Sequence, residues 1–214
     1  PMAGHLLKAG HSLLVHTRTR SKADPLIAQG AEWANSPSEA AERSDFVFTM
    51  LGYPQDVERI YCAEDGILAG CRANSVLIDM TTSNPDLAKR IAGKALGRDA
   101  QALDAPVSGG DVGAKSGKLA IMCGGKKETF DRVLPLLRAM GDKIELFGSS
   151  GSGQRVKMAN QILIASTMVG TVESLLYAER AKLDPTRVIG LIGQGAAGCW
   201  SINQLGPRMV ESDW

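Results

Sequence analysis

The sequence is short of the residues that build metal centres and disulfide frameworks. It has four cysteines and three histidines among 214 residues, and the cysteines are widely spaced, with no CxxC pair. This spacing argues against both a zinc site and a disulfide framework, and it favours free thiols in a reducing compartment. We therefore expect no bound metal, and a location in the cytoplasm or in an organellar matrix.

Charge of one sign and long apolar runs are also lacking. The 24 basic and 23 acidic side chains leave a formal charge of +1, and neither sign forms a block, so nothing indicates a nucleic-acid or membrane partner. No apolar run approaches the roughly 20 residues that cross a bilayer, and no signal-peptide pattern occurs. With 44% apolar residues to fill a core, the sequence predicts a soluble globular protein with a small-molecule ligand.

The chain lacks an initiator methionine. Its first segment, "PMAGHLLKAGH", is typical of a helix already under way that stops at Gly10. The last segment, "GPRMVESDW", supplies no closing element. We therefore expect a chain that is truncated at both ends, with any targeting signal upstream of Pro1.

Short apolar, β-rich runs alternate with helical patterns through the first two thirds of the chain. The predicted strands are Ser12–Thr17, Phe46–Met50, Ser75–Met80, Ala100–Pro106 and Lys118–Gly125. The predicted helices between them are Lys22–Gln29, Ser38–Glu42, Pro54–Ile60, Asp86–Leu96 and Glu128–Met140. Alternation at this spacing indicates a doubly wound α/β domain with a mostly parallel sheet, here assigned to residues 1–151.

A continuous helical pattern replaces this alternation after residue 151. Apolar residues recur at helical spacing from Ser152 to about Lys182, without a proline, which predicts one long helix. A second helix is expected to start at Pro185 and to stop at Gly195. The sequence therefore predicts a partial all-α domain over residues 152–214.

The residues after the first predicted strand bear on the choice of cofactor. In an open parallel sheet, ligands bind outside the carboxyl ends of the strands, and an NAD-binding domain commonly carries Asp or Glu here. This chain has Thr17, Arg18 and Thr19 instead. A guanidinium with two hydroxyls suits a 2′-phosphate, which points to NADP(H) over NAD(H). The alternative is that Arg18 and Arg20 are solvated surface charges.

Two other strand ends carry candidate site residues. In "LDAPVSGGDVGAKSG", Ser108, Gly109 and Gly110 offer a hydroxyl and unobstructed backbone N–H groups that suit a carboxylate. A tight turn that needs glycine for positive φ is the alternative interpretation. Thr82 in "DMTTSNP" lies between a strand and a helix, where it is either a ligand contact or an N-terminal cap.

The segment "GSSGSGQRVKMANQ" joins the two predicted domains. A Walker-type phosphate loop has its lysine directly after the last glycine, whereas Lys157 comes four residues after Gly153, so that interpretation fails. Lys157 and Asn160 are three residues apart, one turn into the long helix, and share a face. The helix N-terminus and partial burial would lower the lysine pKa and suit it to proton transfer. A solvated surface pair is the alternative.

Four segments taken together resemble the β-hydroxyacid dehydrogenase family in their order and spacing: "PMAGHLLKAGH", "DMTTSNP", "LDAPVSGGDVGAKSGKLAIMCGG" and "GSGQRVKMANQ". The similarity is to 3-hydroxyisobutyrate dehydrogenases and tartronate semialdehyde reductases, along essentially the whole chain. It implies a Rossmann-like α/β domain, then a truncated all-α domain that begins with a long connecting helix. The family's first strand and glycine-rich phosphate loop precede a proline that matches Pro1, so both are expected to be missing here.

The resemblance also implies roles for individual residues. Lys157 matches the catalytic general acid or base, and Asn160 matches a residue that orients the substrate. The segment that holds the substrate carboxylate corresponds to Ser108, Gly109 and Gly110. The implied cofactor-binding residues are Thr17, Arg18, Thr19, Met50, Leu51, Gly52 and Thr82.

The implied activity is hydride transfer between NADP(H), or alternatively NAD(H), and a short β-hydroxyacid or its semialdehyde. The long apolar helix suggests a homo-oligomer. One alternative is a non-catalytic binding or scaffold protein with a dehydrogenase fold, against which Lys157 and Asn160 count. Another is a 6-phosphogluconate dehydrogenase-like decarboxylating enzyme, whose phosphorylated substrate would want more basic residues than Lys115 and Lys118.

Overall fold

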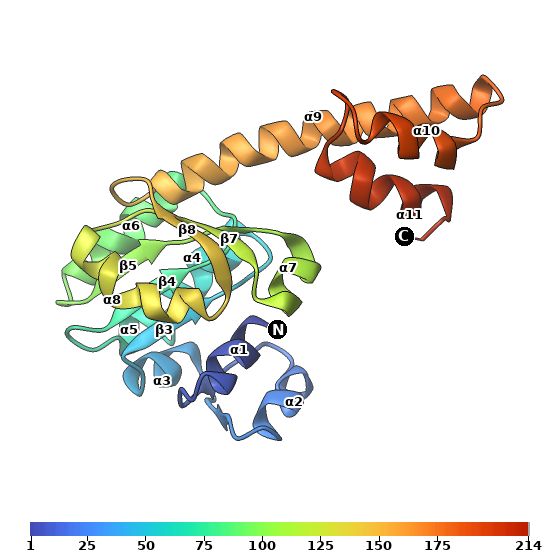
Figure 1. The fold of residues 1–214 in the computed structure, drawn as a ribbon. Coiled ribbons are helices and arrows are strands. Elements are labelled where there is room, and N and C mark those ends of the chain that lie inside the picture. Colours follow the sequence, from blue (N-terminus) through green and yellow to red (C-terminus); the bar gives the residue numbers. More distant parts are fainter. Residues whose placement is uncertain (214) are drawn as a thin grey trace. The chain divides into compact units, whose positions relative to one another are not determined.

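The structure is a computed structural model that describes residues 1–213 (Figure 1). Trp214, the last residue of the predicted second domain, lies outside the described residues. Internal contacts divide the chain into two compact units, Pro1–Lys157 and Met158–Trp214. The first unit is an α/β domain, and the described part of the second is helical.

The first unit is built on short strands: β1 (Leu14–Val15), β2 (Glu32–Trp33), β3 (Phe46–Thr49), β4 (Val76–Asp79), β5 (Gln101–Asp104), β6 (Val107–Ser108), β7 (Leu119–Cys123) and β8 (Gly141–Leu146). They form three sheets, ordered β1-β2, β3-β4-β5 and β6-β7-β8. Every pairing is parallel except that of β6 with β7. An antiparallel bridge between Asp104 and Gly124 connects the ends of β5 and β7.

The helices of this unit are α1 (Met2–Lys8), the 3-10 helix η1 (Arg20–Lys22), α2 (Asp24–Ile27), α3 (Pro37–Glu42), α4 (Pro54–Cys62), α5 (Ile67–Gly70), α6 (Pro85–Leu96), α7 (Gly110–Ser116), α8 (Lys127–Arg138) and the start of α9 (Ser152–Arg180). Local chemistry fixes several of their starts. Ser36 caps α3 by accepting the Glu39 N–H, and a proline occupies the first turn of both α3 and α4.

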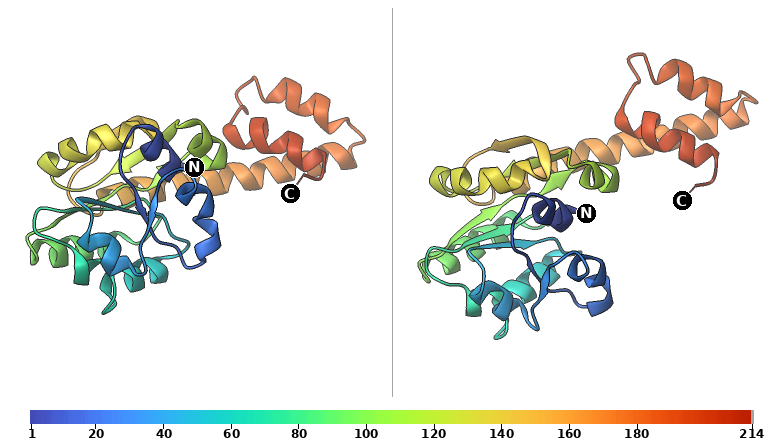
Figure 2. Two further views of the ribbon diagram at one scale, coloured as in Figure 1. Left: turned by 90° about the horizontal axis from the view of Figure 1, so that it is seen from below. Right: turned by 60° about the horizontal axis from the view of Figure 1, so that its bottom comes forward.

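Two apolar cores lie on opposite faces of the sheet β3-β4-β5. Val76 and Ile78 of β4 pack in one core with side chains of α8, whereas Leu77 packs in the other with α3, α4, α5 and α6. This division follows because alternate side chains of a strand point to opposite faces. Figure 2 shows α8 on one side of this sheet and α3 to α5 on the other. The predicted Rossmann-like, doubly wound α/β architecture is therefore confirmed.

Some element boundaries differ from those predicted. The first strand is Leu14–Val15 rather than Ser12–Thr17. The two-residue strand β2, with one exposed and one half-buried side chain, was not predicted because it offers too few residues to show an alternation. The antiparallel strand β6 and the four-residue helix α5 were missed for the same reason. The helix α7 was missed because its seven residues, GDVGAKS, show no apolar periodicity.

The second unit contains the rest of α9, α10 (Pro185–Ile192), the π-helix η2 (Ser201–Leu205) and α11 (Gly206–Val210). Its small core joins Leu175, Ile189 and Ile202. The long helix predicted from Ser152 is confirmed. The predicted stop at Gly195 is wrong, because α10 ends at Ile192 with Gly193 as its C-cap.

By length and composition alone, α9 could cross a membrane. This corrects the sequence expectation that no apolar run was long enough. The property is weak evidence on its own, because the core helix of a soluble protein passes the same test.

Candidate active site

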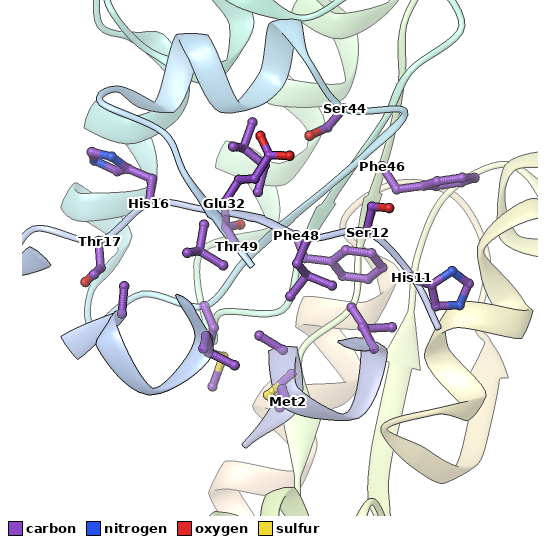
Figure 3. A pocket seen from close by; sticks show the side chains of 18 of the residues that line it. Met2, His11, Ser12, His16, Thr17, Glu32, Ser44, Phe46, Phe48 and Thr49 are labelled. Atoms are coloured by element: carbon purple, nitrogen blue, oxygen red, sulfur yellow. The ribbon is translucent and has the colours of Figure 1, made fainter. Parts of the chain in front are cut away.

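A cavity of about 730 Å³ runs between β1 and β3 (Figure 3). In the doubly wound strand order 3-2-1-4-5-6, the first strand lies between the second and the fourth. If β2 and β1 correspond to strands 3 and 2 of that order, then β3, β4 and β5 correspond to strands 4, 5 and 6. The cavity between β1 and β3 then occupies the place of the first strand. It is lined by Phe48 and other apolar side chains, and also by polar and charged ones such as His16 and Glu32.

The end of this cavity is where a ligand is expected. Two of the predicted cofactor residues, Thr17 two positions after β1 and Met50 directly after β3, line it. The structure thus brings two loops at strand carboxyl ends to one cavity, as ligand sites in this architecture require.

Two arginines follow β1 and differ in their surroundings. Arg18 lies exposed in the loop between Thr17 and Thr19. The guanidinium of Arg20 lies 5.3 Å from the centroid of the Trp33 ring, a distance typical of cation–π stacking. Both arginine side chains are exposed, and the role of Arg18 at a ligand phosphate stays a prediction.

Hydrogen bonds connect the loop after β3 to the loop after β4. The Leu51 N–H donates to Thr81 Oγ1 at 2.9 Å, and the Thr81 N–H donates to Asp79 Oδ1 at 3.1 Å. Thr49 Oγ1 donates to the same carboxylate at 2.9 Å and lies 3.0 Å from the Tyr61 hydroxyl. Burial raises the pKa of Asp79, while the hydrogen bonds from Thr81 and Thr49 oppose this rise. These bonds fix the two predicted cofactor loops relative to each other.

Thr82 does not cap the helix that follows it. Asn84 caps α6, because its Oδ1 accepts the N–H groups of Asp86 at 2.7 Å and Leu87 at 3.4 Å. Thr82 is exposed, directly after the hydrogen-bonded Thr81. The capping interpretation is therefore wrong, and the cofactor contact stays a prediction.

Ser108 ends β6, and Gly109 and Gly110 lead into α7. Both glycines have positive φ, 129° at Gly109 and 62° at Gly110, a conformation that favours glycine. The turn interpretation of this pair is therefore confirmed. Their predicted role in holding a substrate carboxylate is compatible with that turn and stays a prediction.

Lys157 is buried, with 8% of its surface exposed, so it is not a solvated surface lysine. Burial lowers the pKa of its ammonium group, as expected where the charged form is desolvated. Asn160 lies three residues later in α9, half-buried, and its Nδ2 donates to Gln161 Oε1 at 2.9 Å. A buried lysine with a lowered pKa gives up its proton more readily than an exposed lysine, which suits it to proton transfer.

Sequence reasoning missed Asp104 and Gln154, which attach the start of α9 to the sheet. Both are buried. Asp104 accepts two backbone N–H groups from the segment that begins α9, and Gln154 bonds to the loop after β4. The available signals were weak: an acidic residue at the end of an apolar strand, and a glutamine three residues before Lys157.

Neither a metal centre nor a phosphate loop is evident in residues 1–213. No group of three or more His, Cys, Asp or Glu side chains among them could hold a metal ion. The string GQGAAG from Gly193 to Gly198 has the GxGxxG pattern but follows α10 rather than a strand, so it lacks the context of a dinucleotide loop. Asn203 Nδ2 donates to Gly193 O at 3.1 Å, which makes this string a packed turn.

Two family models match the sequence in consecutive segments. Residues 1–148 match the NAD binding domain of 6-phosphogluconate dehydrogenase. Residues 151–214 match the model described as NAD-binding of NADP-dependent 3-hydroxyisobutyrate dehydrogenase.

Similar proteins cover the whole chain. An uncharacterized oxidoreductase, YkwC of Bacillus subtilis, is 46% identical over 100% of this chain and 74% of its own length. Probable 3-hydroxyisobutyrate dehydrogenase-like 1, mitochondrial, of Arabidopsis thaliana is 50% identical over 100% of this chain and 64% of its own length. The solved structure of Mycobacterium tuberculosis 3-hydroxyisobutyrate dehydrogenase with L-serine has a TM-score of 0.85 and 31% identity, covering 97% of this chain and 70% of that one.

Proposed function

We propose a function from one premise: this chain belongs to the β-hydroxyacid dehydrogenase family of NAD(P)-dependent oxidoreductases. The complete protein transfers a hydride between NADP(H) and a short β-hydroxyacid or its semialdehyde. The observation that carries the proposal is the buried Lys157, whose pKa is lowered, at the start of α9. Its helix is hydrogen-bonded to a predicted cofactor loop.

A bound nicotinamide would supply the hydride in reduction and accept it in oxidation. In reduction, Lys157 Nζ donates a proton to the aldehyde oxygen while the carbonyl carbon gains the hydride, so that C=O becomes CH–OH. In oxidation, the neutral Lys157 amine takes the hydroxyl proton while the carbon gives up its hydride. Asn160 orients the substrate, and the segment Ser108–Gly110 holds the substrate carboxylate with its hydroxyl and backbone N–H groups.

The residues at the strand ends fit a nicotinamide dinucleotide. Thr17 and Met50 line the cavity at the carboxyl ends of β1 and β3, and Leu51 and Gly52 continue the second of these loops. Arg18 is exposed beside Thr17, which supports NADP(H) over NAD(H), because a guanidinium suits a 2′-phosphate. The words "NADP-dependent" in the description of the second matching model support the same preference.

The names of the relatives support the proposed substrate class. L-Serine, which is named with the Mycobacterium tuberculosis structure, is itself a β-hydroxyacid. We propose that residues 1–151 bind the cofactor, and that residues 152–214 belong to a substrate and dimerisation domain. Exposed apolar side chains on α9, among them Ile162, Leu163 and Val169, support a homo-oligomer. We expect the cytoplasm or an organellar matrix as the location, and the mitochondrial Arabidopsis relative supports the second.

The test is turnover by the complete protein that carries this chain. It would be assayed with NADPH and NADH against tartronate semialdehyde, glyoxylate and succinic semialdehyde, and with NADP+ and NAD+ against 3-hydroxyisobutyrate and L-serine. Lys157→Met should lower kcat about 100-fold or more, because general acid–base catalysis typically contributes about 10²–10⁴-fold. Binding of NADPH should stay within about threefold, a change worth well under 1 kcal/mol.

Lys143→Met, at an exposed position in β8, is the matched control and should keep full turnover. Absence of turnover with every substrate would overturn the proposal, and NADPH binding without turnover would favour the scaffold alternative. Release of CO₂ from 6-phosphogluconate would favour the decarboxylating alternative. Unchanged turnover in Lys157→Met would remove the lysine from the mechanism.

A further inference from the structure

We infer that Gln154 is a positioning residue that fixes Lys157 relative to the loop after β4. The inference rests on the proposed function, because it concerns the placement of its proton donor. Gln154 lies three residues before Lys157 in α9, with only 1% of its surface exposed. Residues three apart in a helix are held rigidly relative to one another, so an anchor on Gln154 is also an anchor on Lys157.

The side-chain amide of Gln154 binds the backbone of that loop through both its nitrogen and its oxygen. Its Nε2 donates to Thr81 O at 2.8 Å, and its Oε1 accepts the Ser83 N–H at 2.8 Å. These two partners flank Thr82, one of the predicted cofactor-binding residues. An amide that both donates and accepts in this way fixes a loop in position and in orientation.

The backbone of Gln154 is held as firmly as its side chain. Its N–H donates to Asp104 Oδ2 at 2.9 Å, and the Gly151 N–H donates to Asp104 Oδ1 at 2.7 Å. Hydrogen bonds to a carboxylate are stronger than those between neutral groups. The first turn of α9 is therefore attached to the end of β5 as well as to the loop after β4.

The anchoring continues into the other predicted cofactor loop. Thr81 accepts the Gln154 amide through its carbonyl and the Leu51 N–H through its hydroxyl. Gln154 thus belongs to one connected set of buried bonds that reaches from the loop after β3 to the turn that precedes Lys157. Such satisfied buried networks rigidify the groups that they join.

The chemical consequence concerns the rate of turnover rather than cofactor affinity. Hydride and proton must reach adjacent atoms of one carbonyl, so the nicotinamide and Lys157 Nζ need a fixed separation. A misplacement of about 1 Å can lower the rate about 100-fold. Gln154→Met keeps the length and burial of the side chain and removes both amide bonds.

The test uses the complete protein with the best substrate and cofactor from the panel above. Gln154→Met should lower kcat about 100-fold, while Kd for NADPH changes by less than about threefold. Arg155→Met, exposed in the same turn, is the matched control and should keep kcat within twofold. Unchanged kcat in a folded Gln154→Met protein would overturn the inference. Loss of NADPH binding in step with kcat would overturn it too, because Gln154 would then only support the cofactor domain.

Gln154→Glu gives a second test with a readout that a purely structural role would not move. A protonated glutamate has the shape of glutamine, with an O–H to donate to Thr81 O and a carbonyl to accept from Ser83. An ionised one repels Thr81 O. The kcat of Gln154→Glu relative to wild type should therefore rise as the pH falls, because burial favours the neutral carboxyl.

The folded fraction of Gln154→Glu is checked by circular dichroism at each pH. If its kcat relative to wild type does not change with pH, the inference is overturned, even where Gln154→Met does not fold. Failure of the proposed function has a separate signature, since wild-type protein would then show no turnover. If wild type and Gln154→Met are equally active, the positioning role is wrong and the proposed function still stands.

Discussion

Alanine at position 153 tests how closely α9 packs against the sheet. A Cβ atom on Gly153 would lie 2.3 Å from Met122 O, 2.8 Å from Asp104 O and 2.9 Å from Asp104 Oδ2. Folded proteins essentially never show such short contacts, and two of these atoms belong to the backbone, which cannot rotate away. The first turn of α9 would have to move away from the ends of β5 and β7 by several tenths of an ångström.

The energetic cost of that movement has two parts. Overpacking costs about 1–3 kcal/mol. Weakening the bonds from Gly151 and Gln154 to the Asp104 carboxylate, at 2.7 and 2.9 Å, costs further, since each intact bond is worth about 1.5–3 kcal/mol. The higher helix propensity of alanine returns at most about 1 kcal/mol. We expect a net loss of about 3 kcal/mol in the free energy of unfolding, and slower turnover because Lys157 lies on the displaced helix.

Gly93→Ala is the matched control. Gly93 lies inside α6, and a Cβ atom there would meet nothing within 4 Å, so alanine should stabilise the protein by up to about 1 kcal/mol. Urea unfolding followed by circular dichroism gives both values. The midpoint for Gly153→Ala should fall by about 1 M, given a typical slope of about 2–3 kcal/mol/M for a domain of this size. A Gly153→Ala midpoint equal to wild type, or shifted upward as for Gly93→Ala, would refute the close packing.

Two further predictions concern catalysis by the complete protein. Because burial lowers the pKa of Lys157, the lysine loses its proton at a lower pH than an exposed lysine does. In the reductive direction, which needs the protonated lysine, kcat/KM should fall about tenfold per pH unit above that pKa. In the oxidative direction, which needs the neutral amine, kcat/KM should rise with pH until the pH reaches that pKa. Both limbs should be missing in Lys157→Met, and pH profiles that keep them in that variant would contradict the assignment. Arg18→Asp should raise KM for NADPH about 10–100-fold, the equivalent of one or two charge-assisted hydrogen bonds, with little effect on KM for NADH. Arg20→Gln is its control, since Arg20 stacks on Trp33. An equal rise of KM for NADPH in both variants would refute the proposal that Arg18 binds the 2′-phosphate.

The main architecture could be predicted from local sequence because each strong element carries its own pattern. "SVLIDM" gives β4, whose four residues are all buried, and the unbroken apolar periodicity after Ser152 gives α9. The two-residue strand β2 is fixed by its pairing with β1, and a local pattern cannot reveal that. Gly195 and Gly193 are equally good helix stops by composition, and the packing of Asn203 against Gly193 favours the earlier one.

The candidate site also contains residues that a local pattern reveals and residues that it does not. Lys157 was identified from its position on the helix and from the family resemblance, and its burial agrees with the expected lowering of its pKa. Gln154 was missed because its partners, Thr81 and Ser83, lie more than 70 residues earlier in the chain. A glutamine in the first turn of a helix gives no sign of such a distant bond. Contacts of this length depend on the packed fold rather than on any local pattern.

The two buried carboxylates show what this long-range packing achieves. Asp79 and Asp104 end neighbouring strands and are partners in the register of β4 with β5. Burial raises the pKa of both, and the charge of Asp104 raises that of Asp79 further. Neither takes part in an ion pair among residues 1–213, so hydrogen-bond donors alone offset the desolvation of each.

Those donors come from different parts of the candidate site. The donors to Asp79 are Thr49 and Thr81, next to the predicted cofactor loops, and the donors to Asp104 are N–H groups at the start of α9. An uncharged residue at either strand end would avoid the cost of burial but would leave several N–H or O–H groups without an acceptor. The pair therefore ties the position of the Lys157 helix to that of the cofactor loops at the expense of stability, and Gln154 closes the link between them.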